Sequence, residues 1–163
     1  MIAYLALGSN LGDRRSWLAS AVDSLSRRGI QIVRSASIYL TEPQEVVDQP
    51  WFLNTVVEAN TLLSPEQLLE TCLDVEEENS RTRTEVKESR TLDIDIIFYG
   101  DRIVRKPGLS IPHPAFRQRR FVLEPLAEIA PDFVDPITGY TVRQLLKDVY
   151  DSGEIRLFGP PLL

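Results

Sequence analysis

The first quarter of the chain places apolar residues in two different periods, which predict a strand followed by a helix. An apolar run over 2–7 predicts a buried strand that ends in a polar turn at Gly8–Asp13. Apolar spacings of three and four residues over 17–25 predict a helix. Asp13 is its expected N-cap and Gly29 its expected stop.

The next sixty residues predict two further strands and a second helix. A period-two pattern predicts a strand over Ile30–Tyr39, and a polar loop follows at Thr41–Pro50. The Val- and Thr-rich segment Trp51–Leu63 predicts the next strand. Ser64-Pro65-Glu66-Gln67 predicts the start of a helix, with a serine cap, proline in the first position and glutamine closing a capping box.

The last predicted elements complete a familiar order. The second helix is expected to end before a charged loop at Glu76–Ser89, and Thr91–Tyr99 is the clearest strand. A last helix is expected near Val142–Tyr150. The order β-α-β-β-α-β over 2–99 predicts a ferredoxin-like α+β sandwich, an antiparallel sheet with helices and a C-terminal elaboration. We expect one domain over 1–163.

Composition narrows the class of protein. The 163 residues are 43% hydrophobic and 26% charged, which is typical of a soluble globular protein. No apolar run approaches the roughly 20 residues that span a bilayer, and residues 1–8 lack the basic start of a secretory signal. Cys72 and His113 are the only cysteine and histidine, which excludes a disulfide scaffold and a Cys/His zinc site. We therefore expect a cytoplasmic enzyme or binding domain.

Charge is unevenly distributed along the chain. The net charge is −6, yet residues 81–120 carry ten basic and five acidic side chains. The remaining residues are strongly acidic, which argues against sequence-independent binding of nucleic acid. One basic window in an acidic protein indicates a local anion site of nucleotide or phosphate size, with scattered surface arginines as the alternative.

Two aspartates interrupt the clearest strand. Four apolar side chains, two residues apart, are expected to face the core: Leu92, Ile94, Ile96 and Phe98. Asp93 and Asp95 then project together from the other face, where their charges repel. A divalent ion converts this repulsion into coordination, and Mg²⁺ commonly takes carboxylate, water and phosphate oxygens. The alternative is an exposed strand face with capping or salt-bridged aspartates.

Other side chains suggest the ligand. Arginines precede and follow the Asp93–Asp95 strand, and arginine binds phosphate through a planar fork, so the assembly suits phosphoryl transfer. No Lys-Ser/Thr follows the glycine turn, which excludes a P-loop. Phe52 and Phe121 could sandwich a flat heterocycle, and Asn54 could bind its amide edge. His113 could donate to a phosphate oxygen. Packing roles are the alternative for each.

Short motifs are spread over essentially the whole chain. The most specific is Arg90-Thr91-Leu92-Asp93-Ile94-Asp95. The others are Ala6–Asp13, Thr41-Glu42-Pro43, Gln49-Pro50, Phe52-Leu53-Asn54, Glu76 with Arg81-Thr82-Arg83, Ile111-Pro112-His113 and Arg119-Arg120-Phe121. Together, and in this order, they resemble the hydroxymethyl-dihydropterin pyrophosphokinase family of folate biosynthesis.

The resemblance implies transfer of the β,γ-diphosphate of ATP to the hydroxymethyl group of 6-hydroxymethyl-7,8-dihydropterin, with release of AMP. It implies that Asp93 and Asp95 hold two Mg²⁺ ions. The pterin would be stacked and hydrogen-bonded by Phe52, Phe121, Asn54, Thr41, Pro43 and Gln44. ATP would be contacted by Glu76, Arg83, Ile96, Ser110, His113 and Arg119. The residues implied in catalysis are Arg81, Arg90, Asp93 and Asp95, with Arg81 and Arg90 on a loop that closes during turnover.

The chain departs from the family pattern in three places. Lys87-Glu88-Ser89 stands where the family commonly has Trp-Gly-Pro, in a loop one residue shorter. Glu42 replaces a common proline, and Pro114 follows His113 where an aromatic residue can occur. None of these positions is an implied metal ligand or pterin stacker, so we expect activity with an altered rate.

Two other functions use the same features. A palm-type nucleotidyltransferase also places Asp-x-Asp on a ferredoxin-like sheet, but it needs a basic template groove that the acidic remainder of the chain does not offer. A non-catalytic module that senses an anionic metabolite has no need of paired strand aspartates. For the pyrophosphokinase we expect only small-molecule partners, ATP and the pterin, with no nucleic acid, no membrane and a monomeric state.

Overall fold

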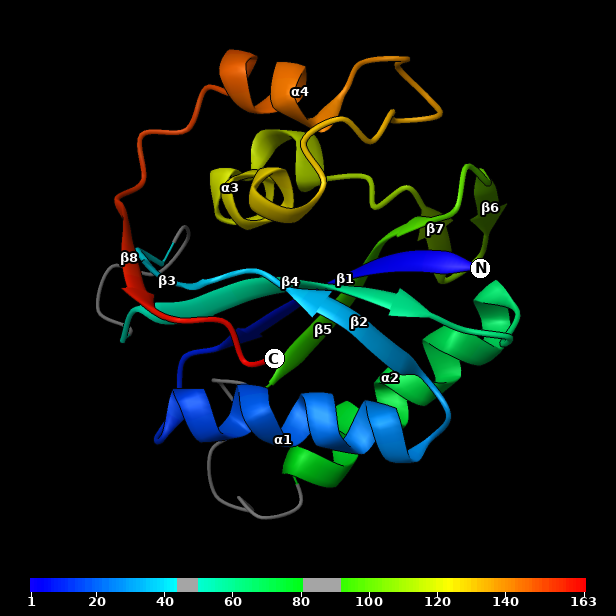
Figure 1. The fold of residues 1–163 in the computed structure, drawn as a ribbon, viewed down its shortest axis with the longest axis vertical. Helices are drawn as coiled ribbons and strands as arrows, with labels where there is room; N and C mark the ends of the chain where they lie inside the picture. Colours follow the sequence, from blue (N-terminus) through cyan, green and yellow to red (C-terminus); the bar gives the residue numbers. More distant parts are fainter. Residues whose placement is uncertain (44–49, 81–91) are drawn as a thin grey trace.

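The computed structural model describes residues 1–43, 50–80 and 92–163, and Figure 1 shows their arrangement. The elements in chain order are β1 (Ile2–Ser9), α1 (Arg14–Arg27), β2 (Gln31–Ser35), β3 (Ile38–Thr41), β4 (Phe52–Asn60), α2 (Pro65–Ser80), β5 (Asp93–Tyr99), β6 (Val104–Lys106), β7 (Leu109–Ile111), the 3₁₀ turn η1 (Phe116–Gln118), α3 (Arg120–Ile129), α4 (Val142–Asp148) and β8 (Ile155–Gly159).

The main sheet is antiparallel, in the order β5-β1-β4-β3-β8. β2 pairs with another part of β4, so β2 and β3 together fill one strand position. With that count the first elements follow β-α-β-β-α-β, and the predicted ferredoxin-like fold is confirmed. β6 and β7 form a separate hairpin.

Helices cover both faces of the sheet, α1 and α2 on one side and α3 and α4 on the other (Figure 1). The core on the α1–α2 face contains Leu5 and Leu7 of β1, together with Leu18 and Leu25 of α1 and Leu68 of α2, all at most 1% exposed. The sequence pattern predicted that two helices lie on one face of the sheet. α1 and α2 do so, and each packs its apolar stripe against this face.

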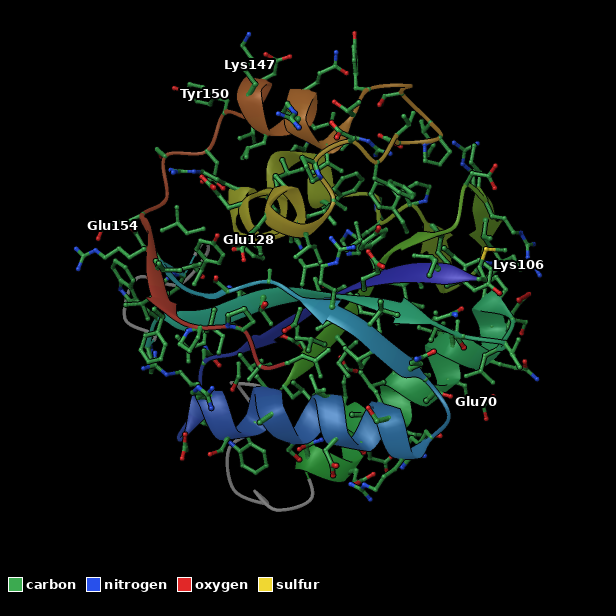
Figure 2. All side chains as sticks on the ribbon, in the orientation of Figure 1. Glu70, Lys106, Glu128, Lys147, Tyr150 and Glu154 are labelled. Carbon is green, nitrogen blue, oxygen red and sulfur yellow. The ribbon has the colours of Figure 1, made fainter. Side chains whose placement is uncertain are left out.

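The core on the α3–α4 face is aromatic at its centre. The ring centroid of Phe98 lies 5.1 Å from that of Phe116 and 4.5 Å from that of Phe133, which in turn lies 5.1 Å from Tyr4. Edge-on and tilted packing of this kind suits the charge distribution of aromatic rings. α3 lies on the sheet here, and its Glu128 accepts hydrogen bonds from the hydroxyls of Ser37 and Tyr39 (Figure 2).

β5 contains a bulge that corrects one prediction. Tyr4 of β1 lies opposite Phe98 and Leu5 lies opposite Ile96, so Ile97 is an extra residue on β5. A bulge interrupts the period of two. Ile96 therefore belongs to the α1–α2 core as expected, whereas Phe98 belongs to the opposite core. The prediction that Phe98 shares a face with Ile96 is wrong.

The predicted helix signals are confirmed at both ends of α1 and at the start of α2. Asp13 accepts from the Ser16 N–H at 3.3 Å, and Gly29 has φ +87°, a conformation that favours glycine. Ser64 and Gln67 form the predicted capping box through N–H···O distances of 2.9 and 3.2 Å.

Three predicted boundaries are wrong. α2 continues to Ser80 instead of ending before Glu76, because acidic side chains on an outer face are good helix formers. β1 runs through Gly8 and Ser9, where a turn was predicted, because both residues pair with β4. The predicted strand Ile30–Tyr39 is divided into β2 and β3.

The C-terminal residues extend the sheet. β8 pairs with β3, so Ile155 lies opposite Thr41 at the edge of the sheet. Within the described residues, the helices are all too short or too polar to cross a membrane.

Candidate active site

One row of residues crosses three strands on the α3–α4 face. Gly8 of β1 lies opposite Asn54 of β4 on one side and opposite Asp93 of β5 on the other. In the next row, Ala6 lies between Val56 and Asp95. Neighbouring strands are about 4.8 Å apart, so Asn54 and Asp93 are separated by only two strand spacings. The register thus brings the predicted heterocycle-binding amide beside the predicted metal-binding carboxylates.

Gly8 is the residue that allows this row to form. A Cβ atom on Gly8 would lie 2.5 Å from Oδ1 of Asn54 and 3.8 Å from a ring carbon of Phe52. The first distance is shorter than a van der Waals contact, so Asn54 occupies the space that any other residue would need. The sequence pattern explained Gly8 only as a turn residue. Its backbone φ is not positive, and the reason for glycine is the close approach of Asn54.

Asn54 is 8% exposed and its orientation is fixed by one hydrogen bond. Its Nδ2 donates to Oγ1 of Thr41 at 2.6 Å, and Thr41 is itself buried. Thr41 lies opposite Phe52 in the pairing of β3 with β4, so the two strands position all three side chains. Among the described residues, this arrangement leaves the second Nδ2 hydrogen and Oδ1 to define a donor and acceptor edge.

The two aspartates occupy the end of β5 nearest Gly8. Both are partly exposed, and the side chain of Asp95 is 44% exposed. Between them, the Ile94 N–H donates to Oε2 of Glu76 at 2.7 Å. β5 is an edge strand, so this bond from α2 satisfies an outward backbone donor and fixes the strand where it carries the carboxylates.

The two carboxylates suit a hard divalent cation. They are oxygen donors two residues apart on one face of a strand, and partial exposure leaves space for further ligands. The described residues contain no cluster of three His, Cys, Asp or Glu side chains that could enclose a metal. An ion held by Asp93 and Asp95 would have coordination positions left that water or phosphate oxygens can fill, which is the usual arrangement for Mg²⁺.

His113 points its Nε2 toward the carboxylates. Its Nδ1 accepts from the Ala115 N–H at 3.1 Å, and Nε2 lies 3.9 Å from Oδ2 of Asp95. Burial lowers the pKa of His113 and the charge of Arg119 lowers it further, while Asp95 opposes them. The neutral imidazole consequently carries its proton on Nε2, where it can act as a hydrogen-bond donor.

Arg119 and Phe121 lie at the start of α3. The guanidinium carbon of Arg119 is 5.6 Å from the ring centroid of Phe121, and Phe121 packs against the α3–α4 core. Phe52 and Asn54 continue the face that Val56 presents to the same core. The predicted pterin and phosphate residues therefore come from β4 and α3 to one side of the sheet.

Comparison with known proteins identifies the family. The sequence profile of 7,8-dihydro-6-hydroxymethylpterin-pyrophosphokinase matches residues 4–131. The chain belongs to this family. The predicted family and enzyme class, a pyrophosphokinase, are confirmed.

Relatives of known name extend the match. The chain is 45% identical over 152 residues to the 2-amino-4-hydroxy-6-hydroxymethyldihydropteridine pyrophosphokinase of Methylorubrum extorquens, covering 93% of this chain and 95% of that one. It is 38% identical to the Haemophilus influenzae protein of the same name, covering 95% of this chain and 97% of that one. It is also 38% identical to the folic acid synthesis protein fol1 of Pneumocystis carinii, covering 91% of this chain but only 20% of that protein.

Solved structures support the fold. The Plasmodium falciparum HPPK-DHPS structure with pteroate matches with a TM-score of 0.76 at 15% identity, over 90% of this chain and 44% of that one. The A437G variant with STZ-DHP matches with a TM-score of 0.73 at 17% identity, over 90% and 45%. The chain thus spans less than half of these proteins.

The structure also describes other residues that the pyrophosphokinase resemblance implies. Ile96 is 6% exposed in the α1–α2 core, on the opposite face from Asp95. Ser110 is exposed on β7 and borders a cavity of about 540 Å³ that Pro112 and Pro114, the neighbours of His113, also line. Pro43 follows β3 and is partly exposed. The predicted residues outside the described ranges are Gln44, Arg81, Arg83 and Arg90.

Of the arginines that follow β5 at positions 117, 119 and 120, two are paired with acids that the sequence pattern did not reveal. Arg117 donates to Oδ2 and Oδ1 of the fully buried Asp135 at 2.6 and 3.0 Å. Arg120 donates to Glu124 at 3.1 Å. Within the described residues, no carboxylate forms an ion pair with Arg119. Among the described residues, Arg119 is thus the arginine of this group whose charge no carboxylate pairs.

Proposed function

We propose that the protein transfers the β,γ-diphosphate of ATP to the hydroxymethyl oxygen of 6-hydroxymethyl-7,8-dihydropterin and releases AMP. The observation that carries the proposal is the row Asn54–Gly8–Asp93, in which an oriented amide and a pair of carboxylates share one sheet face two strand spacings apart. The family and the names of the relatives supply the substrate class. ATP as donor and AMP as product are our extension of these names.

The pterin is held at the β4 end of the row. Phe52 and Phe121 stack on its two faces, and the amide edge of Asn54 pairs with the edge of the heterocycle. Thr41 keeps Asn54 in the orientation that this pairing needs. Pro43 and Gln44 are proposed as further pterin contacts from the family resemblance. This binding places the hydroxymethyl group toward β5.

The transfer itself exchanges one P–O bond for another. The hydroxymethyl oxygen forms a bond to the β-phosphorus, the bond from that phosphorus to the α,β-bridging oxygen breaks, and AMP leaves with that oxygen. The hydroxyl proton passes to solvent. Catalysis of this kind depends on alignment of the two oxygens and on stabilisation of the charge at phosphorus.

Basic side chains stabilise that charge. Arg119 offers a guanidinium that no described carboxylate pairs, and His113 offers the Nε2 proton of a neutral imidazole. Arg81, Arg83 and Arg90 are proposed as further phosphate ligands from the family resemblance. Glu76, Ile96 and Ser110 are proposed to border ATP, Ile96 through its backbone because its side chain is buried in the α1–α2 core.

Asp93 and Asp95 are proposed to hold two Mg²⁺ ions. These ions would neutralise the phosphate oxygens during transfer. Glu76 contributes by holding the Ile94 backbone, which fixes both carboxylates relative to Gly8.

The test is the nucleotide product formed from ATP and Mg²⁺ with and without the pterin. We expect AMP only when the pterin is present, in equal amount to a diphosphorylated pterin. ADP as the product, or AMP formation without pterin, would contradict the proposal. A single domain over 1–163, a monomeric state and a cytoplasmic location stay predictions, which mass measurement in solution and cell fractionation can check.

A further inference from the structure

The chain after α4 returns to the pterin side of the sheet. It runs from α4 along one side of the molecule to β8, next to β3 (Figure 1), and Figure 2 labels Tyr150 and Glu154 along this course. Asp151–Gly159 lies outside residues 4–131, which the family profile matches. We call Asp151–Gly159 the C-terminal strap.

The first contact of the strap is at the start of α3. Oδ2 of Asp151 accepts from the Arg120 N–H at 3.1 Å, and Oδ1 accepts from the Gly153 N–H at 2.9 Å. The N-cap residue Arg119 makes no capping hydrogen bond through its own side chain. Asp151 therefore caps the helix from a distant part of the chain, directly before Phe121.

The second contact is at the strand that supports Asn54. Ile155 of β8 lies opposite Thr41, and the Glu42 N–H donates to the Glu154 carbonyl at 3.0 Å. Thr41 is the hydrogen-bond partner of Asn54. The pairing of β8 thus fixes the strand that orients the pterin-binding amide.

The third contact is next to Phe52. The guanidinium carbon of Arg156 lies 5.7 Å from the ring centroid of Trp51, and the Trp51 carbonyl accepts from Nη1 of Arg14 at 2.6 Å. Trp51 is held between β8 and α1, one residue before Phe52. A cation over an aromatic face contributes about 0.5–1 kcal/mol at an exposed position.

Apolar burial does not explain why β8 is ordered. Leu157 is 70% exposed and Phe158 is 47% exposed, so β8 adds little to either core. The contacts of the whole strap go instead to the segments that carry Phe52, Asn54 and Phe121. We propose that the C-terminal strap is a positioning element that sets the separation of the two aromatic walls, Phe52 on β4 and Phe121 on α3, and thereby the affinity for a flat heterocycle. This inference rests on the proposed function.

Two substitutions test the two ends of the strap. In Asp151→Ala the cap on α3 is lost, and we expect the pterin Kd, measured by calorimetry with Mg²⁺ and a non-hydrolysable ATP analogue, to rise about fivefold. In Arg156→Ala we expect a rise of about two- to threefold. The Kd of the ATP analogue alone should not change in Arg156→Ala, and in Asp151→Ala it should rise less than the pterin Kd, since only Arg119 of the proposed phosphate ligands lies beside the lost cap.

Matched controls separate positioning from general damage. Asp151→Asn keeps an oxygen that can accept from Arg120, so it should restore the pterin Kd, and Arg156→Lys should do the same at the other end. Asp132→Ala and Arg143→Ala remove the same charges from an exposed ion pair of the α3–α4 region and should change neither Kd. Equal weakening of pterin and ATP binding, or an unchanged pterin Kd in Asp151→Ala, would overturn the proposed role of the strap.

Hydrogen exchange supplies a readout that needs no ligand. In Asp151→Ala the Arg120 amide loses its acceptor and should exchange faster. If the strap acts as one unit, the Glu42 amide at the other end of the strap should also exchange faster. If exchange rises only at Arg120, the two ends are not coupled and the proposal is wrong. A wild-type protein that binds no pterin overturns the proposed function and the strap's role together. Normal turnover of the wild type together with unchanged pterin Kd values in the strap variants overturns only the proposed role of the strap.

Discussion

On the α1–α2 face of the sheet, the side chains of β1 are apolar toward its C-terminal end, with Leu5 followed by Leu7. On the α3–α4 face, the same strand packs Tyr4 in an aromatic core but reaches Gly8, where a side chain is excluded. Both faces use the same backbone and the same register. The difference shows that a filled face supplies stability, while the face left polar at one end supplies the site.

The bulge in β5 contributes to this difference. Because Ile97 is an extra residue, Ile97 and Phe98 both belong to the α3–α4 core, directly after the segment that exposes Asp93 and Asp95. The end of β5 that carries the carboxylates is thus joined to a rigid aromatic anchor on the same face. Substitutions on the two faces should accordingly separate activity from stability.

The largest expected effect is a loss of activity from a substitution at the polar end of the α3–α4 face. Asp95→Asn should lower the rate of AMP release by about two to three orders of magnitude, because a charge that faces the phosphates is lost. The melting temperature should not fall, since the Asp95 side chain is 44% exposed. Asp101→Asn, on the turn after β5, is the control and should be fully active. A folded Asp95→Asn protein with normal turnover would contradict the metal assignment.

The next largest effect is a loss of stability from a substitution in the α1–α2 core. Leu18 is fully buried there, so Leu18→Ala should lower the free energy of unfolding by about 3 kcal/mol. Chemical denaturation measures this change. The Kd values for pterin and for an ATP analogue should be those of the wild type. Leu62→Ala removes the same atoms from a fully exposed position and should leave both stability and binding unchanged.

A smaller effect is expected at the centre of the row. In Gly8→Ala the new methyl group collides with Oδ1 of Asn54, so the pterin Kd should rise about tenfold or more as the amide loses its alignment. Calorimetry should find a much smaller change for the ATP analogue. Gly159→Ala is the matched control, because no atom lies within 4 Å of its added Cβ. Equal pterin affinity in both variants would show that Asn54 does not bind the heterocycle.

The smallest expected effect is a pH dependence of the free energy of unfolding, caused by the buried Asp135. Burial alone would raise the pKa of Asp135, but hydrogen bonds from Arg117, Ile137 and Thr138 outweigh burial and hold this pKa below its ordinary value. The stabilisation is therefore complete above about pH 4 and is lost as the pH falls through the lowered pKa.

Asp135→Asn tests this dependence. The variant should be about 1 kcal/mol less stable than the wild type at pH 7, and the difference should shrink on acidification. Urea unfolding at several pH values measures both. Asp132→Asn, an exposed aspartate of the same loop, should show no such convergence. A difference that is constant from pH 7 to about pH 2 would exclude Asp135 as the titrating group.

Features that depend on neighbouring residues in the chain were predictable from the sequence. The cap at Asp13, the capping box at Ser64 and the apolar periods gave the order of the elements, because each signal lies within one helical turn or one strand. The pair Asp93 and Asp95 was predictable for the same reason, since alternation along a strand is a local property. The family resemblance added the chemistry.

Features that depend on contacts between distant segments were not predictable. The bulge at Ile97 arises from pairing with β1, and the need for glycine at position 8 arises from Asn54 on a neighbouring strand. Likewise, the composition of the basic window could not reveal that Arg117 is neutralised by Asp135, eighteen residues later. Such contacts are set by register and packing, which composition and periodicity do not encode.

The late position of β8 in the chain has a consequence for synthesis on the ribosome. Residues 1–99 contain β1 to β5 and can pair as soon as they emerge, but β3 remains an open edge until residue 155 has been translated. Unpaired backbone groups on such an edge are a template for pairing with other nascent chains. The formation of β8 therefore closes an edge of the sheet that stays open while residues 42–154 are being synthesised.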